Sequence, residues 1–164
     1  KNGKKVRIDW LYYTDDADMK EEGENFAVLF QLPIKITEQE IPTQFSLKKT
    51  DNTPLVYFDQ SGDIIIEGNS TGERPWEYYY PLIKWADVMR INSEPQNLKA
   101  EILLYTIDKL NLHYIRHFLT QLDLINRKDD RSVEVIWKYS SEEMKSIGID
   151  YLLNSNIKQT FLKT

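Results

Sequence analysis

The sequence contains no cysteine, which excludes disulfide bonds, cysteine-ligated zinc and thiol chemistry. The absence fits a reducing cytoplasm, where we expect the protein to act. Long hydrophobic runs are also missing, and none approaches the roughly 20 residues of a membrane-spanning helix. The run Ile64-Ile65-Ile66 has the length of a strand and ends at Glu67-Gly68. We therefore expect no membrane segment.

An excess of positive charge is absent as well. Lys and Arg number 21 against 26 Asp and Glu, so the formal net charge is −5. Nucleic-acid-binding proteins gain much of their affinity by neutralising phosphates with Lys and Arg, and this composition argues against such a role. The chain opens on Lys1, without an initiator Met or a secretory signal. We expect Lys1 to lie inside a longer natural protein.

Catalytic and metal-binding motifs are missing too. The sequence has no Gly-rich phosphate loop and no nucleophile elbow. His113 and His117 have a spacing that can bind metal, but no Glu follows His113 as it does in metalloproteases, and both histidines are expected to face solvent. The acidic run 15–24 departs from a calcium-binding EF-hand loop, because Glu21 occupies the position that requires glycine. We expect no metal, no cofactor and no enzymatic activity.

The residues that are present describe a globular α/β protein. Of the 164 residues, 41% are hydrophobic and 29% charged, and the aromatic residues include ten Tyr and four Trp. Apolar and polar periodicity predicts strands at 6–12, 33–36, 55–58, 64–66, 100–106, 133–137 and 157–162. It predicts helices at 19–30, 76–89, 110–125 and 142–153. Strands that alternate with helices indicate a mixed β-sheet with helices packed on it.

Two local patterns concern the helix expected at 76–89. Ser70 and Glu73 have the spacing of a capping box, followed by Pro75, so we expect them to cap that helix. Pro81 falls inside the helix, where proline kinks or splits a helix.

The chain contains an internal repeat, in which residues 6–36 correspond to residues 133–163. Each copy begins with a strand of alternating apolar residues, followed by an acidic turn that is two residues shorter in the second copy. After the turn, a Met-Lys pair, a glycine and an aromatic residue recur at the same distances from the Met. The pairs are Val6 with Val133, Ile8 with Val135, Trp10 with Trp137, Tyr12 with Tyr139, Met19 with Met144, Gly23 with Gly148 and Phe26 with Tyr151. Trp10 and Trp137 are expected in the core.

The repeat predicts the domain organisation. Residues 1–37 are expected to be the C-terminal strand-helix-strand part of a preceding unit, and residues 50–164 a complete unit. Residues 38–49 are expected to be a linker that includes a strand-like run, Phe45-Ser46-Leu47. A strand-helix-strand piece of this size rarely stabilises itself. We therefore expect residues 1–37 to extend a sheet edge, either of the complete unit or of another copy in a homo-oligomer.

The complete unit contains an ordered set of short motifs, Thr53-Pro54-x-Val56-x-Phe58, Gly62-x-Ile64-x-Ile66-x-Gly68-x-Ser70-x-x-Glu73, Tyr79-x-Pro81-Leu82-x-x-Trp85 and Leu103-Leu104-Tyr105. With this set of motifs, the unit resembles the SiaC family of regulatory phosphoproteins. Residues 6–36 resemble the end of the same family. The resemblance implies a fold like that of the STAS-type anti-sigma-factor antagonists. It also implies a bacterial partner switch, with phosphorylation by a Ser/Thr kinase, resetting by a PP2C-like phosphatase, and a diguanylate cyclase that promotes biofilm formation as the target.

The sequence departs from the family at the phosphoacceptor. The family's Asn-Thr-Ser-Ser segment falls on Ile107-Asp108-Lys109-Leu110, so Asp108 occupies the acceptor position and no Ser/Thr kinase can phosphorylate it. Phosphorylation would add about −1.5 to −2 charge at a helix N-terminus, whereas Asp carries −1 there permanently. Either Asp108 fixes a phosphorylated-like state, or it is an ordinary helix cap in a degenerate copy.

The leading hypothesis is a partner-switching adaptor without enzymatic activity. We expect its partner surface to include Trp76, Tyr78, Tyr80, Lys109 and Asn111. The alternative is a structural or dimerising module without its own phosphosite, in which the second copy stabilises a phosphorylatable first copy.

Overall fold

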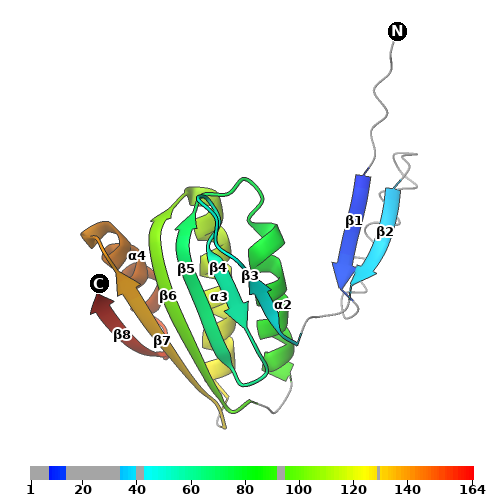
Figure 1. Cartoon of the computed structure of the whole chain (residues 1–164). Coiled ribbons are helices and arrows are strands. Elements are labelled where there is room, and N and C mark those ends of the chain that lie inside the picture. Colours follow the sequence, from blue (N-terminus) through cyan, green and yellow to red (C-terminus); the bar gives the residue numbers. More distant parts are fainter. Residues whose placement is uncertain (1–7, 14–33, 40–42, 92–94, 129) are drawn as a thin grey trace. The chain divides into compact units, whose positions relative to one another are not determined.

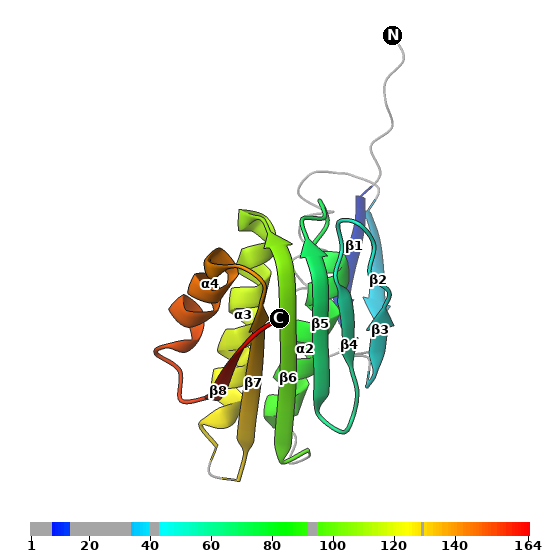
Figure 2. The same cartoon turned by 60° about the vertical axis from the view of Figure 1, so that its left-hand side comes forward.

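Alternating apolar and polar side chains build a six-stranded sheet in the second of the two units into which the chain divides, Lys1–Ile41 and Pro42–Thr164. The computed structural model describes residues 8–13, 34–39, 43–91, 95–128 and 130–164. The strands lie side by side in sequence order (Figures 1 and 2). They are β3 (Phe45–Leu47), β4 (Leu55–Phe58), β5 (Asp63–Ser70), β6 (Asn97–Ile107), β7 (Ser132–Tyr139) and β8 (Lys158–Lys163). The sheet is mixed, because β3 to β5 pair antiparallel and β5 to β8 pair parallel.

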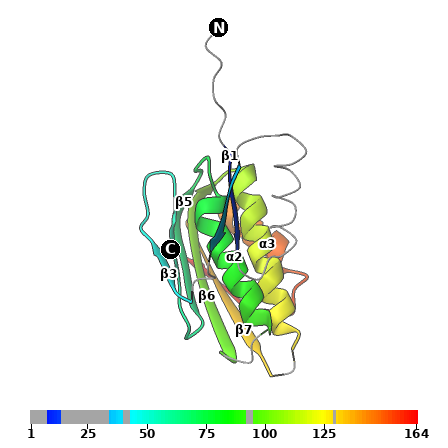
Figure 3. The same ribbon diagram turned by 90° about the vertical axis from the view of Figure 1, so that its right-hand side faces the viewer.

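Three helices connect the parallel strands and cover one face of the sheet. They are α2 (Trp76–Ile91), α3 (Lys109–Asn126) and α4 (Glu142–Leu152). Because each connection runs to the next strand in the same direction, right-handed crossovers place all three on one side. Figure 3 shows α2 and α3 side by side over the sheet. No helix in the described part of the chain is long and apolar enough to cross a membrane.

The hydrophobic core lies between the helices and the sheet. Alternate residues of β5, β6 and β7 are buried in it, and the helical stripes predicted from sequence are buried as expected. On the helices, the core includes Tyr79, Leu82, Ile83, Ala86, Met89, Ile115, Phe118, Leu119 and Leu122. Trp137 is fully buried in β7, which lies between β6 and β8, and its indole donates to the carbonyl oxygen of Met144 at 2.8 Å. The fold class predicted from sequence is confirmed.

Two details of the prediction need correction. The strand-like run Phe45 to Leu47 is a strand, as expected, but it belongs to the sheet and not to a linker, because it pairs with β4 and Phe45 stacks on Phe58 with ring centroids 5.6 Å apart. Pro81 neither ends nor splits α2, which runs through it. The buried side chains on both sides of Pro81, Tyr79 and Leu82, hold the helix against the sheet and offset the loss of one backbone hydrogen bond.

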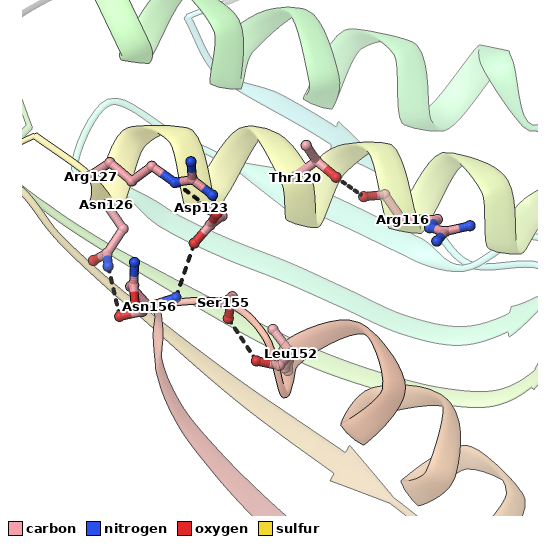
Figure 4. Close-up of polar contacts among 8 residues, drawn as sticks. All are labelled: Arg116, Thr120, Asp123, Asn126, Arg127, Leu152, Ser155 and Asn156. Atoms are coloured by element: carbon pink, nitrogen blue, oxygen red, sulfur yellow. Dashed lines mark hydrogen bonds and ion pairs between the residues drawn. The ribbon is translucent and has the colours of Figure 1, made fainter.

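Polar contacts fix the segment that leads into β8 (Figure 4). Asn126, the last residue of α3, donates to the carbonyl oxygen of Asn156 at 2.8 Å and accepts from the amide of Val133 at 2.9 Å. Asp123 accepts from the amide of Asn156 at 3.1 Å and from Arg127. The end of α3 therefore sets the positions of the strands β7 and β8.

The strand pairing of the first unit has the same register as the corresponding pair of the second unit. Its strands β1 (Ile8–Tyr13) and β2 (Ile34–Gln39) pair in parallel, with Trp10 opposite Ile36. In the second unit, Trp137 lies opposite Phe161. The separation is 26 residues in the first pair and 24 in the second, which is the two-residue difference of the acidic turn. The helix expected at 19–30 and the acidic run lie outside the described residues.

Candidate functional site

Asp108 lies between β6 and α3, at the carboxyl ends of the parallel strands, as predicted. It is the N-cap of α3, with φ −91° and ψ 173°. Its Oδ1 accepts from the backbone N–H of Asn111 at 2.8 Å, and its own N–H donates to the carbonyl oxygen of Ser70 at 3.2 Å. The side chain is half-buried. Asp108 therefore caps α3 and also joins the ends of β5 and β6.

Beneath Asp108 lies a buried polar cluster, the Asn111 cluster, which consists of Ser70, Tyr78, Tyr79, Asn111 and the carboxylate of Asp108. The Oδ1 atom of Asn111 accepts from the hydroxyl groups of Ser70, at 3.1 Å, and Tyr78. The Tyr79 and Ser70 hydroxyl oxygens are 2.6 Å apart. Nδ2 of Asn111 donates to Asp108 at 2.9 Å and to the carbonyl oxygen of Gly72 at 3.1 Å. Strand β5, α2 and α3 thus meet at one amide group.

The cluster corrects the predicted capping box. Ser70 is the last residue of β5, fully buried, and α2 begins only at Trp76. The hydroxyl of Ser70 is hydrogen-bonded with Tyr79 and Asn111, while Glu73 is exposed. The spacing of Ser70 and Glu73 matched a helix cap, but five residues separate the strand from the helix, and the serine ends the strand.

Burial also changes the ionisation of the two phenols. Desolvation raises the pKa of Tyr78 to about 12 from its ordinary value of 10.0, and the charge of Asp108 adds to that rise. Desolvation raises the pKa of Tyr79 further. Both phenols therefore stay protonated at neutral pH and serve as hydrogen-bond donors.

The predicted partner surface is only partly exposed. Trp76 is 46% exposed, Lys109 is exposed and Tyr80 is half-buried. Tyr78 and Asn111, by contrast, are 2% and 0% exposed. These two point inward because Asn111 stands one turn after its cap and Tyr78 faces it from α2. Exposed Leu110 follows Lys109 at the start of α3, so the surface at this end combines Trp76, Lys109 and Leu110.

The two histidines lie on the solvent side of α3, as predicted. The ring of His117 lies 3.3 Å from the amide nitrogen of Gln121, and desolvation lowers the pKa of His117. Among the described residues, no group of three or more His, Asp or Glu side chains is arranged to hold a metal ion.

Sequence reasoning missed the roles of Tyr79 and Gly72 and the buried role of Asn111. One feature of the sequence could have indicated part of this. Asp108-x-x-Asn111 has the spacing of a cap residue followed by a polar partner at the third helical position. The contact with Ser70, 41 residues earlier in the chain, has no local signature.

Comparisons with known proteins agree on one family. The model of the SiaC family of regulatory phosphoproteins matches residues 1–39 and 47–162. The crystal structure of apo-SiaC from Pseudomonas aeruginosa has a TM-score of 0.65 at 16% identity, covering 74% of this chain and 99% of that one. The crystal structure of the diguanylate cyclase SiaD in complex with its activator SiaC, also from P. aeruginosa, contains a chain with a TM-score of 0.66 at 16% identity, covering 73% of this chain and 99% of that one. A comparison with curated proteins gives no match.

Proposed function

Because the chain belongs to the SiaC family of regulatory phosphoproteins, we propose that it is a cytoplasmic adaptor that acts by binding protein partners and has no enzymatic activity of its own. The adaptor belongs to a partner-switching pathway that a Ser/Thr kinase and a PP2C-like phosphatase control. Its target is a diguanylate cyclase, whose activity controls biofilm formation. The solved complex of P. aeruginosa SiaC with the diguanylate cyclase SiaD supports this choice of target.

The position of Asp108 supports a proposal for what determines the signalling state of the second unit. The carboxylate stands at the N-terminus of α3, where the helix dipole favours a negative charge. A phosphorylated hydroxyl at the same place would bring a larger negative charge to the same backbone N–H groups. We propose that Asp108 keeps the second unit permanently in the phosphorylated-like state, so that no kinase can switch it.

Several observations support a tandem arrangement, in which residues 1–37 end a preceding SiaC-like unit. The strands β1 and β2 pair in the register of β7 and β8. The family model matches two separate stretches, 1–39 and 47–162. About three quarters of this chain, 73–75%, covers 99–100% of the solved SiaC chains. A complete unit therefore has about the size of Pro42–Thr164.

A second candidate function is a structural or dimerising module without its own phosphosite. The observation in its favour is that the geometry of Asp108 is that of an ordinary N-cap, with Oδ1 occupied by two hydrogen bonds from Asn111. A cap of this kind is worth about 1 kcal/mol on structural grounds alone. In this case the second unit stabilises its neighbour and carries no signal.

Phosphorylation separates the two candidates. We expect the full chain, incubated with its cognate kinase and ATP, to gain no phosphoryl group within residues 42–164, whereas Asp108→Thr gains one at position 108. Intact mass followed by fragmentation measures this. A second variant restores the whole family segment, Ile107→Asn/Asp108→Thr/Lys109→Ser/Leu110→Ser, in case the kinase reads the neighbouring residues.

The matched control is Ser141→Thr at the N-cap of α4, which offers a threonine at a second helix start that the resemblance does not single out. Phosphorylation of the wild type inside residues 42–164 would contradict the proposal. So would failure of both restored variants to accept a phosphoryl group from a kinase that phosphorylates another SiaC-family protein.

A further inference from the structure

The hydrogen bonds of the Asn111 cluster run in one direction. An amide oxygen can only accept hydrogen bonds, so the hydroxyl groups of Ser70 and Tyr78 each donate their one proton to Oδ1 of Asn111. The proton between Tyr79 and Ser70 must then come from Tyr79. The two Nδ2 protons of Asn111 go to Gly72 and Asp108. Every proton of the cluster has an acceptor, and the path from Tyr79 ends on the carboxylate of Asp108.

Asn111 holds that carboxylate with two donors. Its backbone N–H and its Nδ2 reach the same Oδ1 atom at 2.8 and 2.9 Å. A group of different size or acceptor capacity at position 108 therefore changes the position of the Asn111 side chain. The opposite end of the same amide is bonded to Ser70 and Tyr78, and both of these residues are buried. In a close-packed interior such a shift passes to the bonded partners instead of being lost in solvent.

Two residues of the cluster that receive the shift belong to the start of α2: Tyr78 is bonded to Asn111 directly, and Tyr79 is bonded to it through Ser70. Tyr78 and Tyr79 lie in the first turn of α2, and their rings contact each other with centroids 4.7 Å apart. The same turn begins at Trp76, whose side chain is 46% exposed. A hydrogen-bonded path thus leads from position 108 to the first turn of α2, the turn that carries the exposed Trp76. Tryptophan is a common anchor in protein interfaces.

We propose that Asn111 is a positioning residue that couples the group at position 108 to the first turn of α2, and through it to the exposed side chain of Trp76. The inference rests on the proposed function in one respect, namely that position 108 is where the state of the protein is set. A partner would then contact two helix starts that depend on the group at position 108: the start of α3 directly, and the start of α2 through Asn111.

The test is a ¹H–¹⁵N NMR comparison of the full chain without any partner. We expect Asp108→Ala to shift the indole signal of Trp76, assigned with Trp76→Phe, and the backbone amides of Glu77 to Tyr79. In the background Tyr78→Phe/Tyr79→Phe, which keeps both rings and removes both hydroxyl links, the same substitution should shift these signals at least about threefold less. Asn111→Leu should also abolish the response if that variant folds.

The control is Ser141→Ala, because Ser141 is exposed and caps α4 by accepting from the amide of Met144. Its shifts should stay within the first turn of α4. The inference is overturned if the shifts of Asp108→Ala stay within the first turn of α3, or if they reach Trp76 equally in the double-phenylalanine background. Because no partner is present, a normal NMR response together with unchanged target binding would reject the proposed function and leave the coupling intact.

Discussion

At position 108 a carboxylate satisfies the start of α3 and the Asn111 amide with one oxygen atom. The second oxygen, Oδ2, has no hydrogen-bond partner among the described residues and is free to present charge at the surface of this half-buried side chain. Under the proposed function, this division lets one residue cap the helix with Oδ1 and present the signalling charge with Oδ2. Removing the charge while keeping the acceptor, as Asp108→Asn does, separates the two contributions.

Tyr78 gives a pH-dependent prediction. Burial raises the pKa of its phenol from 10.0 to about 12, so the protonated form is favoured in the folded state. The contribution of its phenol to stability is fully present below about pH 10 and is lost as the pH rises through about 12, with a total of about 3 kcal/mol. Urea unfolding at a series of pH values should show a smaller alkaline loss of the free energy of unfolding in Tyr78→Phe than in the wild type.

The matched control for this prediction is Tyr105→Phe, which removes a hydroxyl from a side chain that is 42% exposed. It should keep the alkaline loss of the wild type. An identical pH dependence in the wild type and Tyr78→Phe would show that the phenol of Tyr78 titrates as an exposed tyrosine does.

Sequence reasoning placed Asp108 correctly but misplaced Ser70, for physical reasons. A helix cap is a local feature, because the cap and the amide that it accepts are three residues apart, and the pattern predicts it directly. The partners of Ser70 come from α2 and α3, so their contact depends on how the elements pack. Asn111 and Tyr78 were expected at the surface for the same reason, since polar groups of their kind are buried only when tertiary partners satisfy them.

Among the elements, α4 is held against the sheet by the contact between Gly148 and Trp137. A Cβ atom on Gly148 would lie 2.6 Å from the indole ring of Trp137. The ring is fully buried and its N–H is bonded to Met144, so it cannot move aside. Gly148→Ala should therefore lower the free energy of unfolding by about 1–3 kcal/mol through overpacking, although alanine normally stabilises a helix relative to glycine.

The control is Ser146→Ala, an exposed position in the same helix, where alanine should be neutral or slightly stabilising. Urea denaturation of the three proteins measures both effects. A Gly148→Ala variant as stable as the wild type would mean that α4 can move away from β7 without loss. The repeat placed Gly23 at the equivalent position, but residue 23 lies outside the described residues.

Strong periodicity predicted the elements better than it predicted their ends. The stripe on α3 and the alternation in β7 identified both elements, because many side chains contribute to each pattern. β6 starts at Asn97 instead of near Ala100, since Leu98 is also buried and continues the alternation. The three residues of β3 are too few to establish a period, and their pairing with β4 depends on packing of Phe45.

At the scale of the whole molecule, the described strands of the two units differ in how many neighbours they pair with. In the second unit, β7 pairs with both β6 and β8, whereas β1 pairs with β2 alone among the described strands. We expect residues 1–37 to extend a sheet edge. Comparing the full chain with residues 42–164 alone should therefore reveal either NMR shift changes at the edge strands β3 or β8, or a doubled mass in sedimentation that truncation abolishes.

Two edge-strand variants serve as controls for the docking outcome, Ser46→Pro in β3 and Thr160→Pro in β8. Each substitution removes one backbone hydrogen-bond donor from an edge strand. If residues 1–37 pair with one of these edges, only the substitution in that strand should abolish the NMR shift changes that residues 1–37 cause. A monomeric full chain whose residues 42–164 have the same NMR shifts with and without residues 1–41 would contradict the expectation.

The central claim is that the second unit is a SiaC-like binding module whose state is fixed by the charge of Asp108. Isothermal titration calorimetry of the cognate diguanylate cyclase against the wild type, Asp108→Asn and Asp108→Thr tests it most directly. The family resemblance implies that the unphosphorylated form engages the target, so a permanent negative charge at position 108 should weaken binding. We therefore expect both neutral variants to bind about tenfold or more tightly than the wild type, a difference of about 1.4 kcal/mol, with little loss of stability for Asp108→Asn. Equal affinities for all three proteins would contradict the claim and leave Asp108 a helix cap in a structural module.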